Sequence, residues 1–262
     1  MNILKPKVYN GFDPTGWWMA EKFDGVRAEW DGEGSFLSKA DKTYHVPKTL
    51  CERMPKIPLS GEWWLGRGMF QKTVSIVRNQ RMDIREWENL KFLVFEMPTI
   101  GPLTFEQRHA YLEQEEPNFP PFVHVILWTI CESRDDFDAN FQRILDNGGE
   151  GMVLAQQGSF YEFKRSSTQW KKTPVFTAEA TVTGHTAGTG KHEGKVGALE
   201  VVAMPFDPDN RCILKFKVGT GLSDVQRSDP PPVGSVITYS YKGLTNAGVP
   251  RHPAFIEVRD YE

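Results

Sequence analysis

Short apolar runs broken by Gly, Pro and Asp fill the first part of the chain, from residue 16 to about residue 103. Runs of this length between such residues predict β-strands that end in turns. They cover residues 17–25, 26–32, 34–39, 59–66 and 90–98. We therefore expect this part of the chain to be rich in strands, with some helix between them.

The pattern changes to helical spacing in residues 105–116 and 134–149. Each stretch follows a residue whose side chain can cap a helix, Thr104 and Ser133, and the second ends at a pair of glycines. Strand-like runs then return in residues 150–157 and 159–165.

Beyond Pro174 the chain reads as alternating strands with glycine-rich turns. Five strands in fewer than about 100 residues suit a small closed barrel such as an OB-fold. These strands are expected over residues 177–186, 197–204, 212–220, 235–243 and 254–262. The predicted fold class is α+β, with antiparallel sheets and helices in residues 1–174 and a small all-β OB-fold domain in residues 175–262.

Composition adds little to this picture. The chain has 262 residues, a formal net charge of −3 and charged residues at 25%, all typical of a soluble globular protein. A sequence pI near 6.1 does not indicate a basic surface, which binding to nucleic acid normally needs. Any contact with nucleic acid must therefore come from a local basic face.

Three separated cysteines, Cys51, Cys131 and Cys212, form no CxxC pair, so we interpret them as small buried side chains. No stretch has the signal-peptide or membrane-span pattern, so we expect no membrane association. The sequence as written predicts a cytoplasmic protein, and a periplasmic mature form is the alternative if a signal peptide has been removed.

The segment Glu21-Lys22-Phe23-Asp24-Gly25-Val26-Arg27 carries the sharpest chemical signal. A lysine leaves an apolar strand where a D-G turn begins, and this geometry presents an amine at the mouth of a pocket. A lysine amine becomes a nucleophile when neighbouring cations or a metal favour its unprotonated form. An exposed turn with three solvated charges would explain the same segment.

Four further segments combine apolar strands with a charged or aromatic residue that can contact a ligand. They are SGEWW with Glu62, FLVFE with Phe95, GEGMVL with Glu150, and a basic run containing Lys164, Arg165, Trp170, Lys171 and Lys172. Each alone has an ordinary structural explanation, as a turn residue, a core strand or a solvated charged face.

The order and spacing of these five segments resemble the covalent nucleotidyltransferases, and the whole chain resembles the short bacterial and viral ATP-dependent DNA ligases. The segment VGTGLSDVQRSDPPPVG and the later PRHPAF are similar to the OB domain of these minimal ligases. The resemblance implies an adenylation domain followed by the OB domain, and an enzyme of replication or repair that seals nicks in double-stranded DNA through a lysyl-AMP intermediate. It also implies ATP as cofactor, and we expect a monomer.

The resemblance also implies individual roles. Lys22 would attack the α-phosphate of ATP, with Arg27 and Lys171 as the other catalytic residues. Glu21, Glu62 and Phe95 would join these three in binding the nucleotide, where Glu62 contacts the ribose and Phe95 stacks on adenine.

The remaining predicted sites hold metal and phosphate. Glu150 would bind Mg²⁺, for which Mn²⁺ is a possible substitute. Lys39 and Arg165 would bind the 5′-phosphate of the DNA. In the OB domain, Arg251 would orient the leaving pyrophosphate.

Three positions depart from the pattern of related ligases. Ser60 stands where the related ligases often have Asp, Lys39 where they have Arg, and Thr173 where they have a second Lys. Lys39 keeps the charge but loses the bidentate fork of arginine. Lys172 is a possible replacement for the missing lysine at Thr173, although neighbouring side chains of a strand point to opposite faces.

Two other kinds of function are compatible with parts of this pattern. An RNA ligase or an mRNA guanylyltransferase would use the same lysine chemistry on a different substrate. A non-catalytic OB-type nucleic-acid binder would have lost the nucleophile, whereas Lys22, Glu62 and Glu150 are all present.

Overall fold

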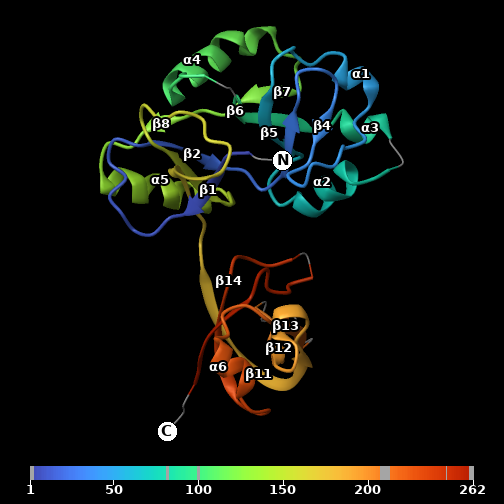
Figure 1. Cartoon of the computed structure of the whole chain (residues 1–262), viewed down its shortest axis with the longest axis vertical. Coiled ribbons are helices and arrows are strands. Elements are labelled where there is room, and N and C mark those ends of the chain that lie inside the picture. The colour runs from blue at the N-terminus through green and yellow to red at the C-terminus, as the bar shows by residue number, and fades with distance from the viewer. Residues whose placement is uncertain (1–2, 81–82, 99–100, 207–212, 246, 260–262) are drawn as a thin grey trace. The chain divides into compact units, whose positions relative to one another are not determined.

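The computed structural model describes residues 3–80, 83–98, 101–206, 213–245 and 247–259. The chain divides into two compact units, Met1–Lys172 and Thr173–Glu262. Figure 1 traces the elements of each unit in chain order. The division lies two residues before the boundary expected from the sequence.

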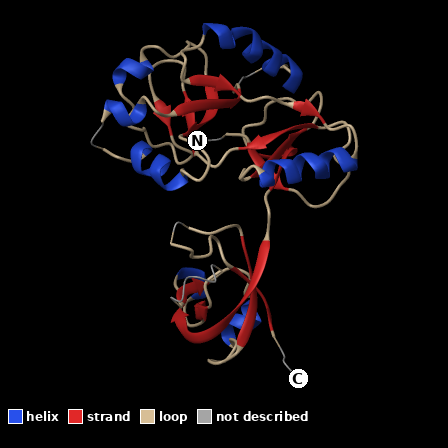
Figure 2. Ribbon diagram, turned by 180° about the vertical axis from the view of Figure 1, so that it is seen from behind, coloured by secondary structure: helices blue, strands red, loops and turns tan. Residues whose placement is uncertain are grey.

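Two five-stranded sheets form the first unit (Figure 2). One sheet has the order β1-β10-β9-β2-β8. Its strands are β1 (Lys5–Val8), β2 (Trp18–Lys22), β8 (Thr129–Ile130), β9 (Gly151–Ala155) and β10 (Arg165–Lys172). All its pairings are antiparallel except that of β1 with β10.

The second sheet has the order β4-β3-β5-β6-β7. Its strands are β3 (Val26–Trp30), β4 (Phe36–Leu37), β5 (Leu59–Trp64), β6 (Lys91–Glu96) and β7 (Val123–Val125). The sequence predicted antiparallel sheets. Among the described strands of this sheet, only the pairing of β6 with β7 is parallel. The turn at Asp24-Gly25 carries the chain from the first sheet to the second.

Apolar side chains from both sheets meet in one core cluster. Ala20 and Ala155 come from the first sheet and Leu93 from the second, with Trp128 and Phe105 beside them. The two sheets therefore face one another, and a side chain on either inner face lies close to the opposite sheet.

The two predicted helices are present as α4 (Phe105–Glu115) and α5 (Arg134–Asp146). Thr104 forms a capping box with Gln107, and Ser133 accepts a hydrogen bond from the backbone of Asp136. The helix that the sequence predicted between the strands of the first part, without bounds, is present as α1 (Lys48–Cys51), α2 (Phe70–Val77) and α3 (Ile84–Trp87). The 3-10 turn Glu116–Asn118 was not predicted.

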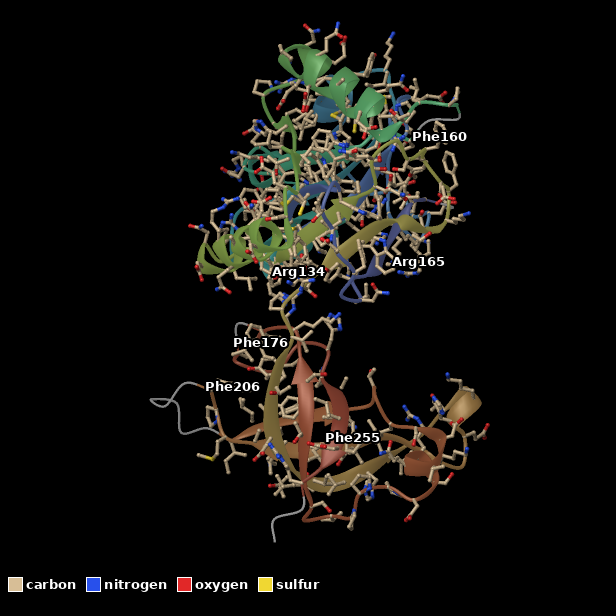
Figure 3. All side chains as sticks on the ribbon, turned by 90° about the vertical axis from the view of Figure 1, so that its left-hand side faces the viewer. Arg134, Phe160, Arg165, Phe176, Phe206 and Phe255 are labelled. Atoms are coloured by element: carbon tan, nitrogen blue, oxygen red, sulfur yellow. The ribbon has the colours of Figure 1, made fainter. Side chains whose placement is uncertain are left out.

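The strand predicted over residues 159–165 is wrong. This segment is a loop, and regular pairing begins only at Arg165, the first residue of β10. Tyr161 is buried, and its hydroxyl accepts a hydrogen bond from the backbone of Leu4. Phe160 is exposed at the edge of the unit (Figure 3). The alternation of this segment thus reflects one anchored aromatic side chain in a loop.

The second unit is a five-stranded antiparallel sheet with the order β13-β12-β11-β14-β15. A bridge between Thr220 and Ala254 joins the two edges and closes it as a barrel. This confirms the predicted OB-like fold. Its elements are β11 (Phe176–Ala187), β12 (Val196–Ala203), β13 (Leu214–Val218), β14 (Val236–Tyr241), β15 (Ala254–Val258), α6 (Asp224–Ser228) and the 3-10 turn Gly190–His192.

Cys131 is buried and Cys51 is partly buried, and both are free thiols. Cys212 lies outside the described residues. Within the described part of the chain, no helix is long and apolar enough to cross a membrane.

His109 on α4 should make the stability of the first unit depend on pH. The ring is buried against Phe105 and Trp128, and this burial lowers its pKa below the usual 6.5. As pH falls through about 6.5, the unfolded chain takes up a proton that the folded chain does not, so stability is lost.

We expect the loss in the free energy of unfolding between about pH 7.5 and 5.5 to be smaller in His109→Leu than in the unmodified protein. Urea titrations at both pH values measure it. Equal losses in the two proteins would rule His109 out as a source of the pH dependence.

Candidate active site

A cavity of about 260 Å³ opens between the inner faces of the two sheets. It brings together the residues predicted to bind nucleotide and phosphate in the first unit. The predicted residues that line it are Glu21, Lys22, Arg27, Lys39, Glu62, Phe95, Arg165 and Lys171. The fold thus gathers side chains that lie far apart along the chain.

Lys22 ends β2 and projects into this cavity. Its Nζ forms an ion pair with the carboxylate of Glu150, the residue just before β9. Both side chains are partly exposed, at 21% and 26%. Lys22 stands opposite Gly151 in the antiparallel ladder, so strand pairing fixes the lysine beside Glu150.

Gly25, three residues after Lys22, allows strand β5 of the second sheet to lie close to the D-G turn. A Cβ at this position would lie 2.7 Å from the Cγ of Glu62, closer than packed atoms allow. The glycine of the D-G turn is therefore required by the close contact between this turn and β5.

Glu62 lies on the inner face of β5, between Arg27 on β3 and Leu93 on β6 in the strand register. Desolvation raises the pKa of the Glu62 carboxyl to about 7. Lys22 acts in the opposite direction, and the negative charge of Glu150 adds to the increase. This site therefore holds a carboxyl group that titrates near neutral pH.

Phe95 offers a ring face on the neighbouring strand, β6. The guanidinium of Arg27 lies over this ring, with its Cζ 5.1 Å from the centroid. Val153, on the opposite sheet, lines the same cavity. A flat apolar ligand can bind between an aromatic face and an aliphatic side chain of this kind.

The two lysines of β10 differ in their surroundings. Lys171 lines the cavity. Lys172 forms an ion pair with Asp138 at 2.9 Å, and its Nζ lies 4.4 Å from the ring centroid of Phe137. Lys172 therefore packs against α5, which favours Lys171 as the phosphate ligand.

Two residues near the cavity were not predicted from the sequence. Arg67 holds the Glu21 carboxylate through hydrogen bonds of 2.6 and 2.9 Å. Gln169 lines the cavity and donates a hydrogen bond of 3.3 Å to Glu96, which pairs in turn with the buried Arg108. Spacing along the chain gives no signal for these contacts, because they join separate elements.

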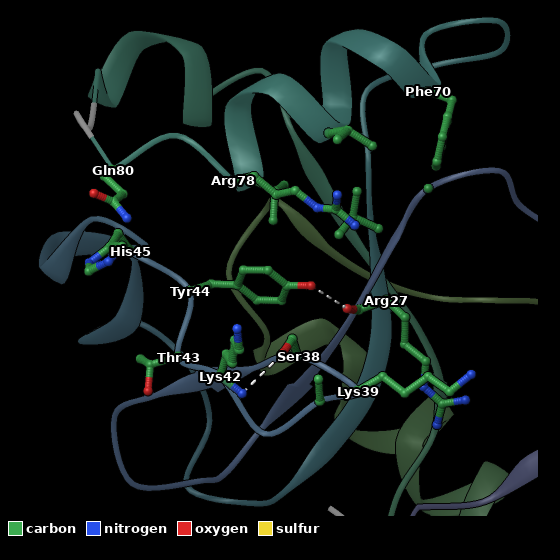
Figure 4. A pocket seen from close by; sticks show the side chains of 15 residues that line it. Arg27, Ser38, Lys39, Lys42, Thr43, Tyr44, His45, Phe70, Arg78 and Gln80 are labelled. Carbon is green, nitrogen blue, oxygen red and sulfur yellow. Dashed lines mark hydrogen bonds between the residues drawn. The ribbon is translucent and has the colours of Figure 1, made fainter. Parts of the chain in front are cut away.

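A second cavity, of about 580 Å³, adjoins the first and shares Arg27 and Lys39 with it. Figure 4 shows it from close by. We call it the basic groove, because its ionisable lining side chains, apart from Tyr44, are Arg27, Lys39, Lys42, His45 and Arg78, and none of its described lining residues is acidic. Tyr44 donates a hydrogen bond of 3.2 Å to the Arg27 carbonyl. The groove is therefore a local basic surface, despite the negative net charge.

Of the other two predicted phosphate-binding residues, Arg165 lines the first cavity and Arg251 lies in the second unit. Arg165 begins β10, and it donates a hydrogen bond of 2.9 Å to the Pro6 carbonyl (Figure 3). Arg251 belongs to the second unit, where its backbone pairs with Lys242 and Gly243.

These side chains can carry out nucleotidyl transfer. The first cavity offers the amine of Lys22, further lysine and arginine side chains, the carboxyl groups of Glu21 and Glu62, and the aromatic face of Phe95. Fixed cations stabilise the charge that develops on a transferring phosphoryl group. The groove beside them can bind a second polyanion.

Comparison with known proteins agrees with this chemistry. Residues 187–259 match the family model for a DNA ligase OB-like domain. The DNA ligase of Haemophilus influenzae is 32% identical over 97% of this chain and 91% of its own length.

Solved structures extend the similarity to the fold. A Lig E DNA ligase, described as binding DNA with a minimal scaffold, has a TM-score of 0.89 and 31% identity, and 99% of each chain is covered. The ATP-dependent DNA ligase of bacteriophage T7 in complex with ATP has a TM-score of 0.53 and 18% identity, with 98% of each chain covered, and shares the fold. Similarity to DNA ligases therefore runs through both units, and this chain belongs to the DNA ligase family.

Proposed function

We propose that this DNA ligase uses ATP to seal nicks in double-stranded DNA through a lysyl-AMP intermediate on Lys22. The observation that carries the proposal is the cavity in which Lys22 lies with Glu62, Phe95 and Lys171. The reaction gives a role to the amine, the buried carboxyl, the aromatic ring and the second lysine of this cavity, whereas an RNA ligase or guanylyltransferase finds no support among the relatives.

In the first step the unprotonated Nζ of Lys22 attacks the α-phosphorus of ATP. The new N–P bond replaces the bond to pyrophosphate, which leaves, and the amine loses a proton to solvent. Lys171 and Arg27 stabilise the negative charge on the phosphoryl oxygens. Phe95 stacks on the adenine, and Glu62 accepts a hydrogen bond from a ribose hydroxyl.

In the two following steps the 5′-phosphate at the nick takes AMP from Lys22. The 3′-hydroxyl then attacks that phosphate, forms the phosphodiester bond and releases AMP. Lys39 and Arg165 bind the 5′-phosphate. Arg251 of the second unit orients pyrophosphate in the first step, and the enzyme acts as a monomer.

Glu150 fits a divalent cation of the Mg²⁺ type. No group of three or more metal-binding side chains occurs among the residues that the structure describes. Mg²⁺, however, commonly binds one or two carboxylates together with substrate phosphates, and Glu150 is a carboxylate beside the nucleophile. When bound there, Mg²⁺ or Mn²⁺ would offset phosphate charge in the transfer.

The basic groove is the proposed site for the nicked strand. It meets the nucleotide cavity at Arg27 and Lys39, so a phosphate at their junction lies close to both. Each phosphate contact releases counterions, so affinity for the nick should fall steeply with salt. Formation of lysyl-AMP needs no DNA, so its rate should depend much less on the salt concentration than affinity for the nick does.

Lys42→Ala should weaken binding of nicked duplex and reduce the slope of log affinity against log salt by about 0.9, because one phosphate contact is lost. Lys48→Ala is the matched control, since Lys48 is 88% exposed on α1 and does not line the groove. Binding titrations across a sodium chloride series measure both variants. Equal slopes for Lys42→Ala and the unmodified protein would exclude the groove as the DNA site.

A further inference from the structure

Glu29 is a buried carboxylate that the reaction described above does not use. It lies on β3, two residues after Arg27, and is only 3% exposed. A charged group at this depth is costly unless an opposite charge or hydrogen bonds compensate it. The groups that compensate the Glu29 carboxylate are therefore the ones on which it can act.

Two partners satisfy the Glu29 carboxylate. The Nε of Arg27 donates a hydrogen bond of 2.7 Å to Oε1. The hydroxyl of Ser60 donates to Oε2. Ser60 is fully buried on β5 and is the direct register partner of Glu29, so strand pairing holds the hydroxyl against the carboxylate.

The hydrogen bond from Nε to Glu29 holds one edge of the Arg27 guanidinium in place. With Nε held by Glu29, the plane of the guanidinium lies over the Phe95 ring. Arg27 lines both the nucleotide cavity and the basic groove. An untethered arginine side chain has many rotamers, and ordering it costs free energy at each turnover.

We infer that Glu29 is a positioning residue for nucleotidyl transfer, which holds Arg27 at the junction of the nucleotide cavity and the basic groove. This inference rests on the proposed role of Arg27. Glu29 contacts no substrate itself, and its effect passes through the guanidinium. Ser60 in turn holds Glu29.

The position of Ser60 follows from the same cluster. Its other register neighbour is Glu96 on β6, a buried carboxylate paired with Arg108. A hydroxyl between two buried carboxylates donates a hydrogen bond without adding a third negative charge. A carboxylate at position 60 is therefore compatible with this cluster only if Glu29 is replaced.

The test measures the rate of lysyl-AMP formation for Glu29→Gln, Arg27→Ala and the double variant, each over a range of ATP concentrations. Misplacing a group of this kind costs about tenfold to a hundredfold in rate. We expect Glu29→Gln to lose that factor at saturating ATP. In the Arg27→Ala background, the same change should have almost no further effect. Glu86→Gln, which removes the carboxylate of an exposed ion pair with Lys72, is the control.

An exchange of the two side chains separates positioning of Arg27 from a loss of stability. If Glu29→Gln melts at a lower temperature, the exchange Glu29→Ser with Ser60→Asp returns a carboxylate from the opposing strand, and it should recover activity lost by Glu29→Ser alone. A folded exchange variant without recovery would overturn the inference. So would an equal loss from Glu29→Gln with and without Arg27. If the unmodified protein forms no lysyl-AMP, the proposed function fails instead.

Discussion

Incubation with ATP and a divalent cation is expected to give a covalent adduct one AMP heavier than the protein, attached to Lys22. Lys22→Ala should lower the adduct below detection. Lys22 ends a strand inside the nucleotide cavity, and its Nζ lies beside a carboxylate. Among the lysines that line this cavity, it is the one that ends a strand just before the D-G turn.

Intact-mass spectrometry measures the adduct, and fragmentation locates it. Lys91→Ala is a suitable control, because Lys91 is exposed at the start of β6. An adduct that persists in Lys22→Ala would show that another residue is the nucleophile.

Removal of the Glu150 carboxylate is expected to have the second large effect. Glu150→Ala should reduce the rate of nick sealing by at least about a hundredfold, because a metal at a transferring phosphate contributes several kcal/mol. Glu150 lies just before β9, and its side chain is partly exposed. Its loss should therefore leave the melting temperature close to that of the unmodified protein.

Because Glu150 also pairs with Lys22, a second variant must separate the two roles. Glu150→Gln keeps a hydrogen-bonding group beside the amine but loses the charge that attracts a cation. We expect it to need a much higher concentration of Mg²⁺ for half-maximal sealing. A normal Mg²⁺ requirement with near-normal sealing would exclude the metal role. A lowered melting temperature would indicate a structural role.

Much of the fold follows from local patterns. Helices α4 and α5 each begin after a residue that caps them, and the sequence predicted both. Helix α2 begins after Met69, which provides no side-chain cap, so no local signal marks its start. Residues 159–165 were predicted as a strand but form a loop. Tyr161 is buried there, and this gives the sequence an alternation like that of a strand.

Some residues of the candidate site were also predicted from local motifs, and others were not. Lys22, Glu62 and Glu150 were predicted because each occupies a short motif whose order along the chain resembles that of the ATP-dependent DNA ligases. Glu29 was not predicted, because it alternates with apolar residues along its strand, and charged residues in such a pattern normally face solvent. Here the second face of the sheet is covered, and only the three-dimensional structure shows that Glu29 is buried beside Arg27.

Sealing assays with two substrates test whether Lys22 carries AMP to a nick in DNA. One is a nicked DNA duplex with ATP and Mg²⁺, and the other is the same duplex already carrying AMP on its 5′-phosphate. The unmodified protein should seal both. Lys22→Ala should fail on the first and still seal the second slowly, because the last step does not require the lysyl-AMP bond. Sealing of the first substrate by Lys22→Ala, or of neither substrate by the unmodified protein, would show that Lys22 does not carry AMP to the nick.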